Sequence, residues 1–581
     1  MFMRPQLKYL LIGLALLLGG GEVWRRVTML AVPDIQPVAL TAFAGLFLFC
    51  AISLTGFALL RQSWLRWPIA ALMAAGSMLV DGYQWAVGDF MDYDGFVTMT
   101  QSTGDLGNAI AQQGPVLIWA AAKAIILFFA IGLKPVGAAS VATRAASWTA
   151  LPILLLLTTV LFFRGGEGAS GLPTSHSSMS YLSLFGYEYV TADRAPREEV
   201  AIARAPDKLT SDIVLIIDES IAGAYLDINS IDGVYSGLLD PKPGVSIHNF
   251  GLATSINHCS VGSNVTLRFG GTRDNYRDTI RSKPSIWAYA KQAGLGTIYI
   301  DGQRTGGRFQ NQMNAQERKL IDQWDQFADV PVQQRDHAVA DRLSDYLNDD
   351  IPQFILVNKV GAHFPVNDKF PASHATYRPM LKRGQYPDVT DMASDDDIDG
   401  GDSSWELYRN SYRNTLTWQV GGFFDRLIAD ADLTDATLIY TADHGQTFHE
   451  RGEQGQATHC TPNPAIEEGV VPLVVLGGSA DGAESARWAA AAQTGQNQRS
   501  HYRIFPTLLG LMGYAAEDVR PVYGVDLFSD EPDPFTFNVR FHARLGSSPS
   551  WLHVPVEKIA RPPTSDYRKI PGGKSSGDRT K

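Results

Sequence analysis

The sequence predicts two parts: an N-terminal transmembrane domain of five helices, and an α/β domain whose mostly parallel sheet is covered by helices on both faces. Long apolar stretches fill the first 164 residues, and later sequence alternates short β-rich runs with amphipathic segments. Charge follows the same division, because residues 1–164 contain 10 of the 49 Lys and Arg and 7 of the 60 Asp and Glu. A chain of 581 residues is also too long for one ordinary core.

Five apolar stretches predict membrane spans, each long enough to cross the hydrocarbon core of a bilayer: roughly 7–24, 38–60, 67–87, 115–133 and 146–163. A cleaved signal peptide would be followed by soluble sequence, whereas four more apolar stretches follow the first. Basic residues mark the cytoplasmic ends of the spans: Arg4, Lys8, Arg61, Arg66, Lys134 and Arg144. We therefore expect a multi-pass membrane protein with all residues after Arg164 on the outer side, which in a Gram-negative bacterium means an inner-membrane protein whose later residues lie in the periplasm.

Composition sets the remaining domain boundaries. Residues 165–204 are rich in Gly, Ser and charge, and predict a linker with one short amphipathic piece. The α/β domain is expected over 205–545, followed by a weakly basic, disordered tail over 546–581. A net charge of −11 provides no broad basic surface, which excludes nucleic acid as a partner.

The α/β domain follows from alternating patterns. Predicted strands are DIVLIID (212–218), TIYID (297–301), FILVNKV (354–360), ATLIYTAD (436–443) and VVPLVVLGG (470–478), and predicted helices are KPSIWAYAKQAG (283–294), HAVADRLSDYL (337–347) and SYRNTLTWQVGGFFDRLIADA (411–431). Such alternation predicts a parallel sheet. Ligands of these sheets bind beyond the carboxyl ends of the strands.

Polar side chains follow several of these strands, namely Asp218, Glu219, His363, Asp443 and His444, and together with His459 further along the chain they are the candidate site residues. Carboxylates and imidazoles that converge at one sheet edge suit a divalent transition metal, Zn²⁺ above all, with Mn²⁺ or another divalent cation as alternatives. Taken singly, Asp218 and Glu219 are also consistent with capping a following helix. Asp443-His444-Gly445 is also consistent with a simple turn. In the metal-binding interpretation, Gly445 lets the backbone turn away after the two ligands.

Seven motifs then occur in order: DESIAGAYLDI, NHCSVGSNVTL, VGAHFPVNDKFP, YRNTLTWQ, YTADHGQTFHERG, THCTPNP and SHYRIFPTLLGLMGY. Over roughly 205–530 the chain thereby resembles the sulfatase-like branch of the alkaline phosphatase superfamily. Within that branch it is most similar to the membrane-anchored phosphoethanolamine transferases, which also carry a five-span anchor. The resemblance implies a sulfatase-like α/β/α catalytic domain.

The resemblance further implies a nucleophilic Thr, Ser or Cys bound to the metal, with a second Ser often three residues later. Ser260 and Ser263 have this spacing, so Ser260 is the expected nucleophile. Cys259 competes, because sulfatases use a modified Cys in Cys-x-Pro-Ser-Arg, but neither Cys259 nor Ser260 is followed by that Pro and Arg.

The expected metal ligands are Glu219, Asp443, His444 and Ser260, by the same resemblance. Asp218 ranks second, since true sulfatases use both carboxylates of such a pair while phosphoethanolamine transferases usually have Gly there. His363 and His459 correspond to histidines that contact the phosphoryl group or a second metal, and they complete the expected catalytic set.

The function so implied is transfer of phosphoethanolamine from a membrane phospholipid donor to a periplasmic lipid or glycan acceptor through a covalent Ser260 intermediate, by a monomeric, membrane-embedded enzyme. Modification of lipopolysaccharide is one such reaction. Phosphoglycerol transfer and hydrolysis of a phosphodiester or sulfate ester remain alternatives, and a binding protein that has lost activity is a further one. The motifs do not decide the acceptor or the head group.

Two further features complete the sequence interpretation. Of three cysteines, Cys50 lies within a span, and a bond between Cys259 and Cys460 is a hypothesis for an oxidising compartment. Residues 395–406 match the acidic spacing of a calcium-binding EF-hand loop, but Asp402 occupies a normally apolar position. We interpret that segment as an acidic loop leading into a helix.

Overall fold

The computed structural model describes most of the chain: residues 5–20, 23, 26–27, 37–87, 90–101, 106–135, 141–163, 168–191, 196–205, 209–240, 243–303, 313–384, 389, 402–452, 458–461, 463–478, 482–541, 548–564 and 568–569. It divides into two compact units, which are considered separately below. The first comprises Met1–Arg194 with His542–Pro549, and the second Ala195–Phe541 with Ser550–Lys581.

The first unit is helical: α1 (Pro5–Gly19), α3 (Pro37–Ala58), α4 (Ser63–Val87), α5 (Tyr93–Gln101), α6 (Leu106–Gly132), α7 (Val141–Phe163) and α8 (Thr174–Thr191). Each of the five predicted spans falls on one of these helices. Within the described residues, Leu40–Ala58 and Gly114–Gly132 are long and apolar enough to cross a membrane, and Gln6–Gly19 and Ser147–Phe163 are shorter apolar helices. The count of five spans therefore stays a prediction.

Polar contacts join the apolar helices of this unit. Lys123 on α6 donates a hydrogen bond of 2.7 Å to Asp81 on α4, so this lysine faces the helix bundle. The other oxygen of Asp81 accepts from Ser77 at 2.9 Å and from Thr174 on α8 at 3.1 Å. Charged groups among apolar helices are costly unless they are paired in this way.

Helix α8 lies where the sequence predicted a linker with a short amphipathic piece. Its buried side is formed largely by small hydroxyl residues, among them Ser175, Ser177 and Ser178. Such residues allow close helix packing but give no apolar periodicity, which is why the pattern predicted a linker. The helix packs against α4 and α7 instead.

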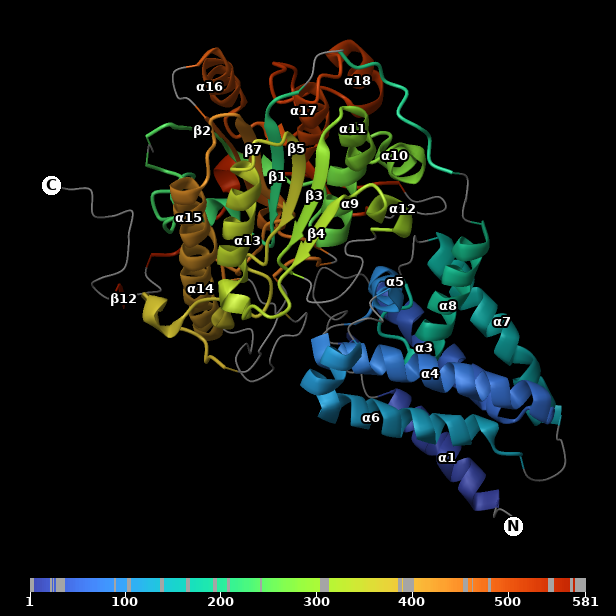
Figure 1. Cartoon of the computed structure of the whole chain (residues 1–581). Coiled ribbons are helices and arrows are strands. Elements are labelled where there is room, and N and C mark those ends of the chain that lie inside the picture. Colours follow the sequence, from blue (N-terminus) through green and yellow to red (C-terminus); the bar gives the residue numbers. More distant parts are fainter. Residues whose placement is uncertain are drawn as a thin grey trace. The chain divides into compact units, whose positions relative to one another are not determined.

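The second unit is built on an eight-stranded sheet (Figure 1). The strand order is β4 (Gln323–Gln326), β3 (Gly296–Asp301), β5 (Gln353–Asn358), β1 (Asp212–Asp218), β7 (Ala436–Ala442), β8 (Val470–Gly478), β2 (Val245–Thr254) and β9 (Arg499–Ser500). The pairs made by β8 with β7 and β2 are antiparallel, and the others are parallel. The predicted α/β domain with a mostly parallel sheet is confirmed.

Helices and short strands complete the unit: α9 (Ser260–Phe269), α10 (Tyr276–Ser282), α11 (Ile286–Gln292), α12 (Ala315–Arg318), α13 (Val332–Leu347), α14 (Asp402–Leu416), α15 (Gly422–Asp430), α16 (Ala483–Gly495), α17 (Ile504–Leu511) and α18 (Ala516–Tyr523), with β6 (Tyr377–Arg378), β10 (Thr536–Asn538), β11 (Trp551–His553) and β12 (Arg568–Lys569). Strands β11 and β12 come from the predicted tail and pair with β10 and β6. Most of the acidic loop lies outside the described residues, and α14 begins at Asp402.

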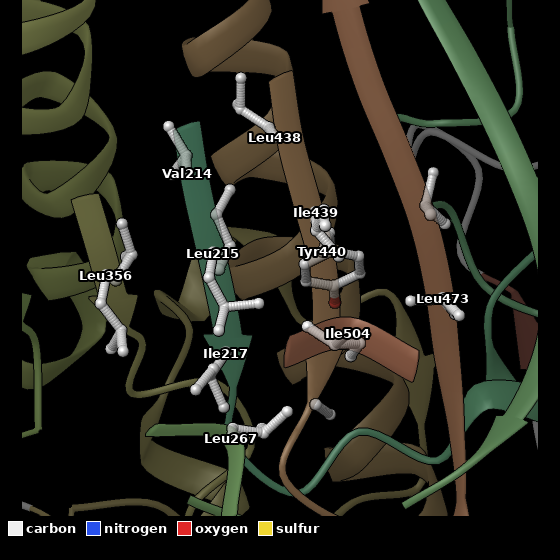
Figure 2. Close-up of a cluster of buried hydrophobic side chains, with 14 of the residues drawn as sticks. Val214, Leu215, Ile217, Leu267, Leu356, Leu438, Ile439, Tyr440, Leu473 and Ile504 are labelled. Atoms are coloured by element: carbon white, nitrogen blue, oxygen red, sulfur yellow. The ribbon is translucent and has the colours of Figure 1, made fainter. Parts of the chain in front are cut away.

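Strand register shows that helices cover both faces of the sheet. Ile213 pairs with Phe354 on β5 and with Thr437 on β7, so Phe354 and Thr437 share a face, and Tyr440 lies on the other. Trp287 of α11 contacts Phe354, with ring centroids 5.3 Å apart. Phe424 of α15 contacts Tyr440 at 4.8 Å. Figure 2 shows part of this buried cluster, in which strand residues such as Leu215 and Ile439 lie with Leu267 of α9 and Ile504 of α17.

Trp287 provides a test of this packing. Its ring is fully buried against Tyr299 and Phe354, and its Nε1 has no hydrogen-bond partner within the described part of the chain. Trp287→Ala should lower the free energy of unfolding by about 3–5 kcal/mol, because it leaves a cavity, and should therefore lower the Tm of the detergent-solubilised protein. Trp287→Phe keeps the ring contacts and removes an unpaired donor that costs about 1–3 kcal/mol. The Trp287→Phe variant should therefore lose much less stability than Trp287→Ala. Equal decreases in Tm for the two variants, measured by scanning fluorimetry, would contradict this packing.

Candidate active site

Three ligand-bearing side chains meet at the carboxyl edge of the sheet. Glu219 follows β1, and Asp443 and His444 follow β7. These strands are parallel neighbours with Asp218 opposite Ala442, so the residues that follow them emerge together. One ligand atom from each of Glu219, Asp443 and His444 lies within 4.8 Å of the others, and all three side chains are buried. Carboxylate oxygens with an imidazole nitrogen suit Zn²⁺.

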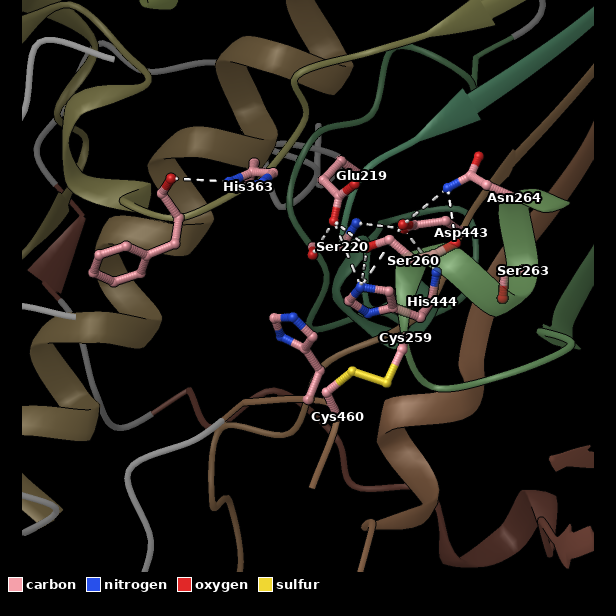
Figure 3. Close-up of polar contacts among 12 residues, drawn as sticks. Glu219, Ser220, Cys259, Ser260, Ser263, Asn264, His363, Asp443, His444 and Cys460 are labelled. Carbon is pink, nitrogen blue, oxygen red and sulfur yellow. Dashed lines mark hydrogen bonds and ion pairs between the residues drawn. A yellow bond between two sulfur atoms is a disulfide. The ribbon is translucent and has the colours of Figure 1, made fainter. Parts of the chain in front are cut away.

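Ser260 is the first residue of α9 and lies against this cluster (Figure 3). Its hydroxyl donates to Glu219 Oε1 at 3.2 Å and lies 3.2 Å from His444 Nε2. Asn264, one turn along α9, donates to the Ser260 carbonyl at 3.1 Å. Ser263 has a different role, because its hydroxyl donates to the Asn257 carbonyl and so closes the turn before the helix. The site thus combines the predicted nucleophile with three predicted ligands.

Two residues that the sequence interpretation missed hold Glu219. Gln303 Nε2 donates to Glu219 Oε2 at 2.8 Å, and Ser220 Oγ donates to Oε1 at 2.9 Å. The Ser220 amide also donates to Asp443 at 3.0 Å, from a left-handed backbone with φ of 62°. Gln303 follows β3 at the same sheet edge, so the strand-end rule that selected the other residues also applies to it.

Asp218 lies outside the cluster. It is on the strand face of Tyr440, which donates to its Oδ2 at 3.1 Å, and Lys359 forms a fully buried ion pair with the same oxygen at 2.5 Å. Oδ1 accepts from the Glu219 amide at 3.0 Å. Side chains one residue apart in a strand point to opposite sides, so Asp218 and Glu219 separate. The structure therefore does not bring Asp218 together with the other predicted ligands.

The protonation of the cluster reflects its crowding. Burial, reinforced by the charge of Glu219, raises the pKa of Asp443 to about 7. Burial also raises the pKa of Glu219, but hydrogen bonding to His444 and the charges of His363 and His444 outweigh it and hold that pKa well below its usual value. Burial lowers the pKa of His444, yet Asp443 and Glu219 raise it to about 9. Two close carboxylates thus favour a cation beside them.

His444 is oriented by its backbone neighbour. Its Nδ1 lies 2.7 Å from the Gly445 carbonyl, which makes Nδ1 the donor and leaves Nε2 toward Ser260 and Glu219. Gly445 itself is needed for close approach, because a Cβ there would lie 2.3 Å from the Glu467 carbonyl oxygen and 2.4 Å from that of Val470. The sequence interpretation, in which Gly445 lets the chain turn away from the strand, stays a prediction beside this steric requirement.

The two other predicted catalytic histidines differ in position. His459 stacks on His444, with ring centroids 4.3 Å apart and planes 26° apart. Burial and the charge of His444 hold the pKa of His459 well below its usual value, so its ring is neutral. His363 lies apart from Ser260 in Figure 3, with its Nδ1 3.0 Å from the Phe364 carbonyl oxygen.

A disulfide joins Cys259 to Cys460, as the sequence hypothesis stated, with 5.1 Å between the Cα atoms (Figure 3). Cys259 precedes Ser260, the predicted nucleophile, and Cys460 follows His459, so the bond connects the two segments that carry these residues. Cys50 is buried and free. Disulfides persist in oxidising compartments.

The fold and parts of the sequence are similar to known proteins. Kdo(2)-lipid A phosphoethanolamine 7''-transferase of Escherichia coli (strain K12) is 26% identical over 263 residues, which are 43% of this chain and 43% of that protein. The protein of the same name from Salmonella typhimurium is 23% identical over 313 residues, 51% of this chain and 46% of that protein. The match thus spans less than half the length of either curated relative.

Among solved structures, the integral membrane protein lipooligosaccharide phosphoethanolamine transferase A (EptA) from Neisseria meningitidis has a similar fold. The TM-score is 0.60 at 15% sequence identity, and the match covers 90% of this chain and 98% of that one. The Sulfatase family model matches residues 211–514, which is more than half of the chain and includes every residue of the cluster described above. The chain belongs to the sulfatase family.

Proposed function

We propose that this protein is a metal-dependent transferase that moves phosphoethanolamine from a membrane phospholipid to a periplasmic lipid or glycan acceptor. One observation carries the proposal: the Ser260 hydroxyl lies 3.2 Å from both a carboxylate and an imidazole of a buried three-ligand cluster. The curated relatives are named for phosphoethanolamine transfer to Kdo(2)-lipid A, which supports the head group and a lipopolysaccharide acceptor.

The ligand set of Glu219, Asp443 and His444 fits Zn²⁺, with Mn²⁺ or another divalent cation as the alternative. Ser260 Oγ would complete four ligands, and Asp218 is left out because Lys359 already neutralises it. When bound, the cation supplies positive charge that lowers the pKa of the serine hydroxyl and offsets charge on the phosphoryl oxygens.

The chain's own residues then carry two steps. Ser260 Oγ attacks the phosphorus of the donor lipid, so that an O–P bond forms, the bond from phosphorus to the diacylglycerol oxygen breaks, and the head group remains on Ser260 as a phosphodiester. An acceptor hydroxyl attacks the same phosphorus and releases Ser260. His459, neutral at rest and beside His444, would take up a proton from Ser260 or the solvent and, as imidazolium, give it to the leaving diacylglycerol oxygen. In the second step the neutral ring would take the proton of the acceptor hydroxyl.

Two features near Ser260 and Glu219, the N-terminus of α9 and His363, support these steps. Ser260 begins a ten-residue helix, whose N-terminal amides favour a phosphate oxygen. His363, whose charge lowers the pKa of Glu219, would contact the phosphoryl group from the other side of that carboxylate.

We further propose that the protein is a monomer of the bacterial inner membrane, with its α/β domain in the periplasm. The helices that meet the length and apolarity required for a span support the anchor, and the Cys259–Cys460 bond supports an oxidising compartment. The sulfatase family match favours a second candidate, in which the same Ser260 intermediate is released by water.

The nucleophile is tested by mass spectrometry of the detergent-purified protein after incubation with phosphatidylethanolamine or phosphatidylglycerol. A head-group adduct should appear on the peptide containing Ser260 with phosphatidylethanolamine, and should be absent from Ser260→Ala. Ser263→Ala is the matched control and should keep the adduct, because that hydroxyl serves the turn before α9. If only phosphatidylglycerol gave an adduct, the transferred group would be phosphoglycerol and not phosphoethanolamine. If zinc-loaded protein gave neither adduct, hydrolysis would be the remaining candidate function.

The ligand set is tested by comparing adjacent carboxylates. Glu219→Gln preserves size but removes a ligand, so zinc affinity should fall by more than the roughly 10–100-fold typical of an outer-sphere partner. Asp218→Asn should instead lower the Tm, because it removes the nearer of the two carboxylates that pair with buried Lys359 and leaves only Asp336, 3.7 Å away, while zinc affinity is retained. Competition with a zinc-binding dye and scanning fluorimetry measure both quantities, and the reverse pattern would place Asp218 among the ligands.

Proton release on zinc binding tests the protonation of the cluster. A raised pKa of about 9 keeps His444 protonated at pH 8 in the metal-free protein, and zinc must displace that proton. Calorimetry in two buffers of different ionisation enthalpy should show roughly one proton released by Ser260→Ala at pH 8 and almost none at pH 10. Wild type should release more than the variant, because its serine hydroxyl also ionises; equal release would argue against that ionisation.

A further inference from the structure

The disulfide connects the two catalytic sides of the site. Cys259 is the N-cap residue of α9 and directly precedes Ser260. Cys460 directly follows His459, and the two cysteines are 201 residues apart in sequence. Cys460 adopts a left-handed backbone with φ of 57°, which a non-glycine residue rarely adopts without support from its surroundings. Cys460 is exposed, whereas the His459 side chain is half-buried against His444.

His459 has few other anchors among the described contacts. Its Nδ1 lies 3.0 Å from the hydroxyl of its neighbour Thr458, whose carbonyl accepts from the Thr447 amide at 2.8 Å. The Cys460 amide donates to the His258 carbonyl at 3.2 Å. The ring itself is placed by stacking on His444, the imidazole that also lies 3.2 Å from Ser260 Oγ. A covalent bond one residue away therefore fixes where this ring can lie.

We propose that the Cys259–Cys460 disulfide is a positioning element for His459, which holds that imidazole over His444, the ring that lies next to Ser260. This inference rests on the proposed function, because it assigns the bond to the proton transfers described above. A dithiol in the surroundings would switch the element off. Reduction breaks the S–S bond, forms two thiols and converts the dithiol to a disulfide, with two electrons and two protons transferred.

The surrounding fold is held independently of this bond. The buried carboxylate of Glu468 lies 3.0 Å from His258 Nδ1, accepts from the Thr461 hydroxyl at 2.7 Å and accepts from the Ala465 amide at 3.0 Å. These contacts hold the segments on both sides of the disulfide. The protein should therefore remain folded without the bond, and loss of positioning can be separated from loss of structure.

The test is a double-mutant cycle on the full-length protein in a Cys50→Ala background, which removes the remaining thiol. The variants are Cys259→Ala with Cys460→Ala, His459→Ala, and all three changes together. Adduct formation on Ser260 and its transfer to an acceptor are followed in single turnovers with phosphatidylethanolamine. Bound zinc and Tm are measured in the same samples. His553→Ala, at an exposed histidine on β11, is the matched control and should change nothing.

Loss of the disulfide should slow at least one step by about tenfold or more, with stoichiometric zinc retained. His459→Ala should slow the same step, and adding the cysteine changes to it should cause no further loss, since both act through one ring. The proposal would be overturned if the rate losses from the cysteine changes and from His459→Ala multiplied when combined, or if the disulfide variant were as fast as the background. Rate losses that multiply would mean that the bond acts on Ser260 or on stability and not through His459.

A second measurement decides the proposal even if no adduct forms. Amide hydrogen exchange in the peptide containing Thr458–Thr461 should accelerate in the double cysteine variant, while peptides containing Glu219 and Asp443 stay protected. Unchanged exchange around His459 would overturn the positioning role. Absence of any adduct in the zinc-loaded background would instead contradict the proposed transferase function, and the two failures are therefore distinguishable.

Discussion

The site depends on one electrostatic constraint, the burial of two carboxylates beside a single imidazole. One ligand atom from each of Glu219, Asp443 and His444 lies within 4.8 Å of the others, and all three side chains are buried at the edge of the sheet. Like charges at such separations favour a cation between them, which is either a proton or a metal ion. The raised pKa values of Asp443 and His444 show that these groups hold protons more tightly than usual. The arrangement of the three side chains is also suited to a metal ion in place of those protons. Ser260 is placed where either cation would act on its hydroxyl.

The same constraint explains the separate pairing of Asp218. A third carboxylate in the cluster would add further negative charge beside Glu219 and Asp443. Here Asp218 turns to the other face of the sheet, where Lys359 neutralises it and the Lys359 ammonium also donates to the Gln419 carbonyl at 3.0 Å. The Asp218 backbone still serves the site, because its carbonyl accepts from the Asp443 amide at 2.9 Å. Its role is thus to align β1 with β7, on which the ligand distances depend.

The sequence predicted the elements whose signals are local. Runs such as DIVLIID and ATLIYTAD mark β1 and β7, and polar residues after parallel strands fall at one edge of any such sheet. Glu219, Asp443 and His444 followed from that rule, while the choice of Ser260 needed the family resemblance. What could not be predicted depends on partners distant in sequence. The side taken by Asp218 is set by Lys359, 141 residues away, and α8 is stabilised by packing of hydroxyl residues that give no apolar period.

His459 raises a different physical problem from the three candidate metal ligands. Glu219, Asp443 and His444 follow buried strands directly, so the sheet limits their freedom. His459 follows no strand, and a histidine in a loop must give up rotamer and backbone freedom to reach a reacting atom. Stacking on His444 orients the ring, and the adjacent disulfide restricts the backbone that carries it. The bond also ties that backbone to the residue before the nucleophile. A shift of α9 would then be shared by His459, so the disulfide limits how far His459 can move relative to Ser260.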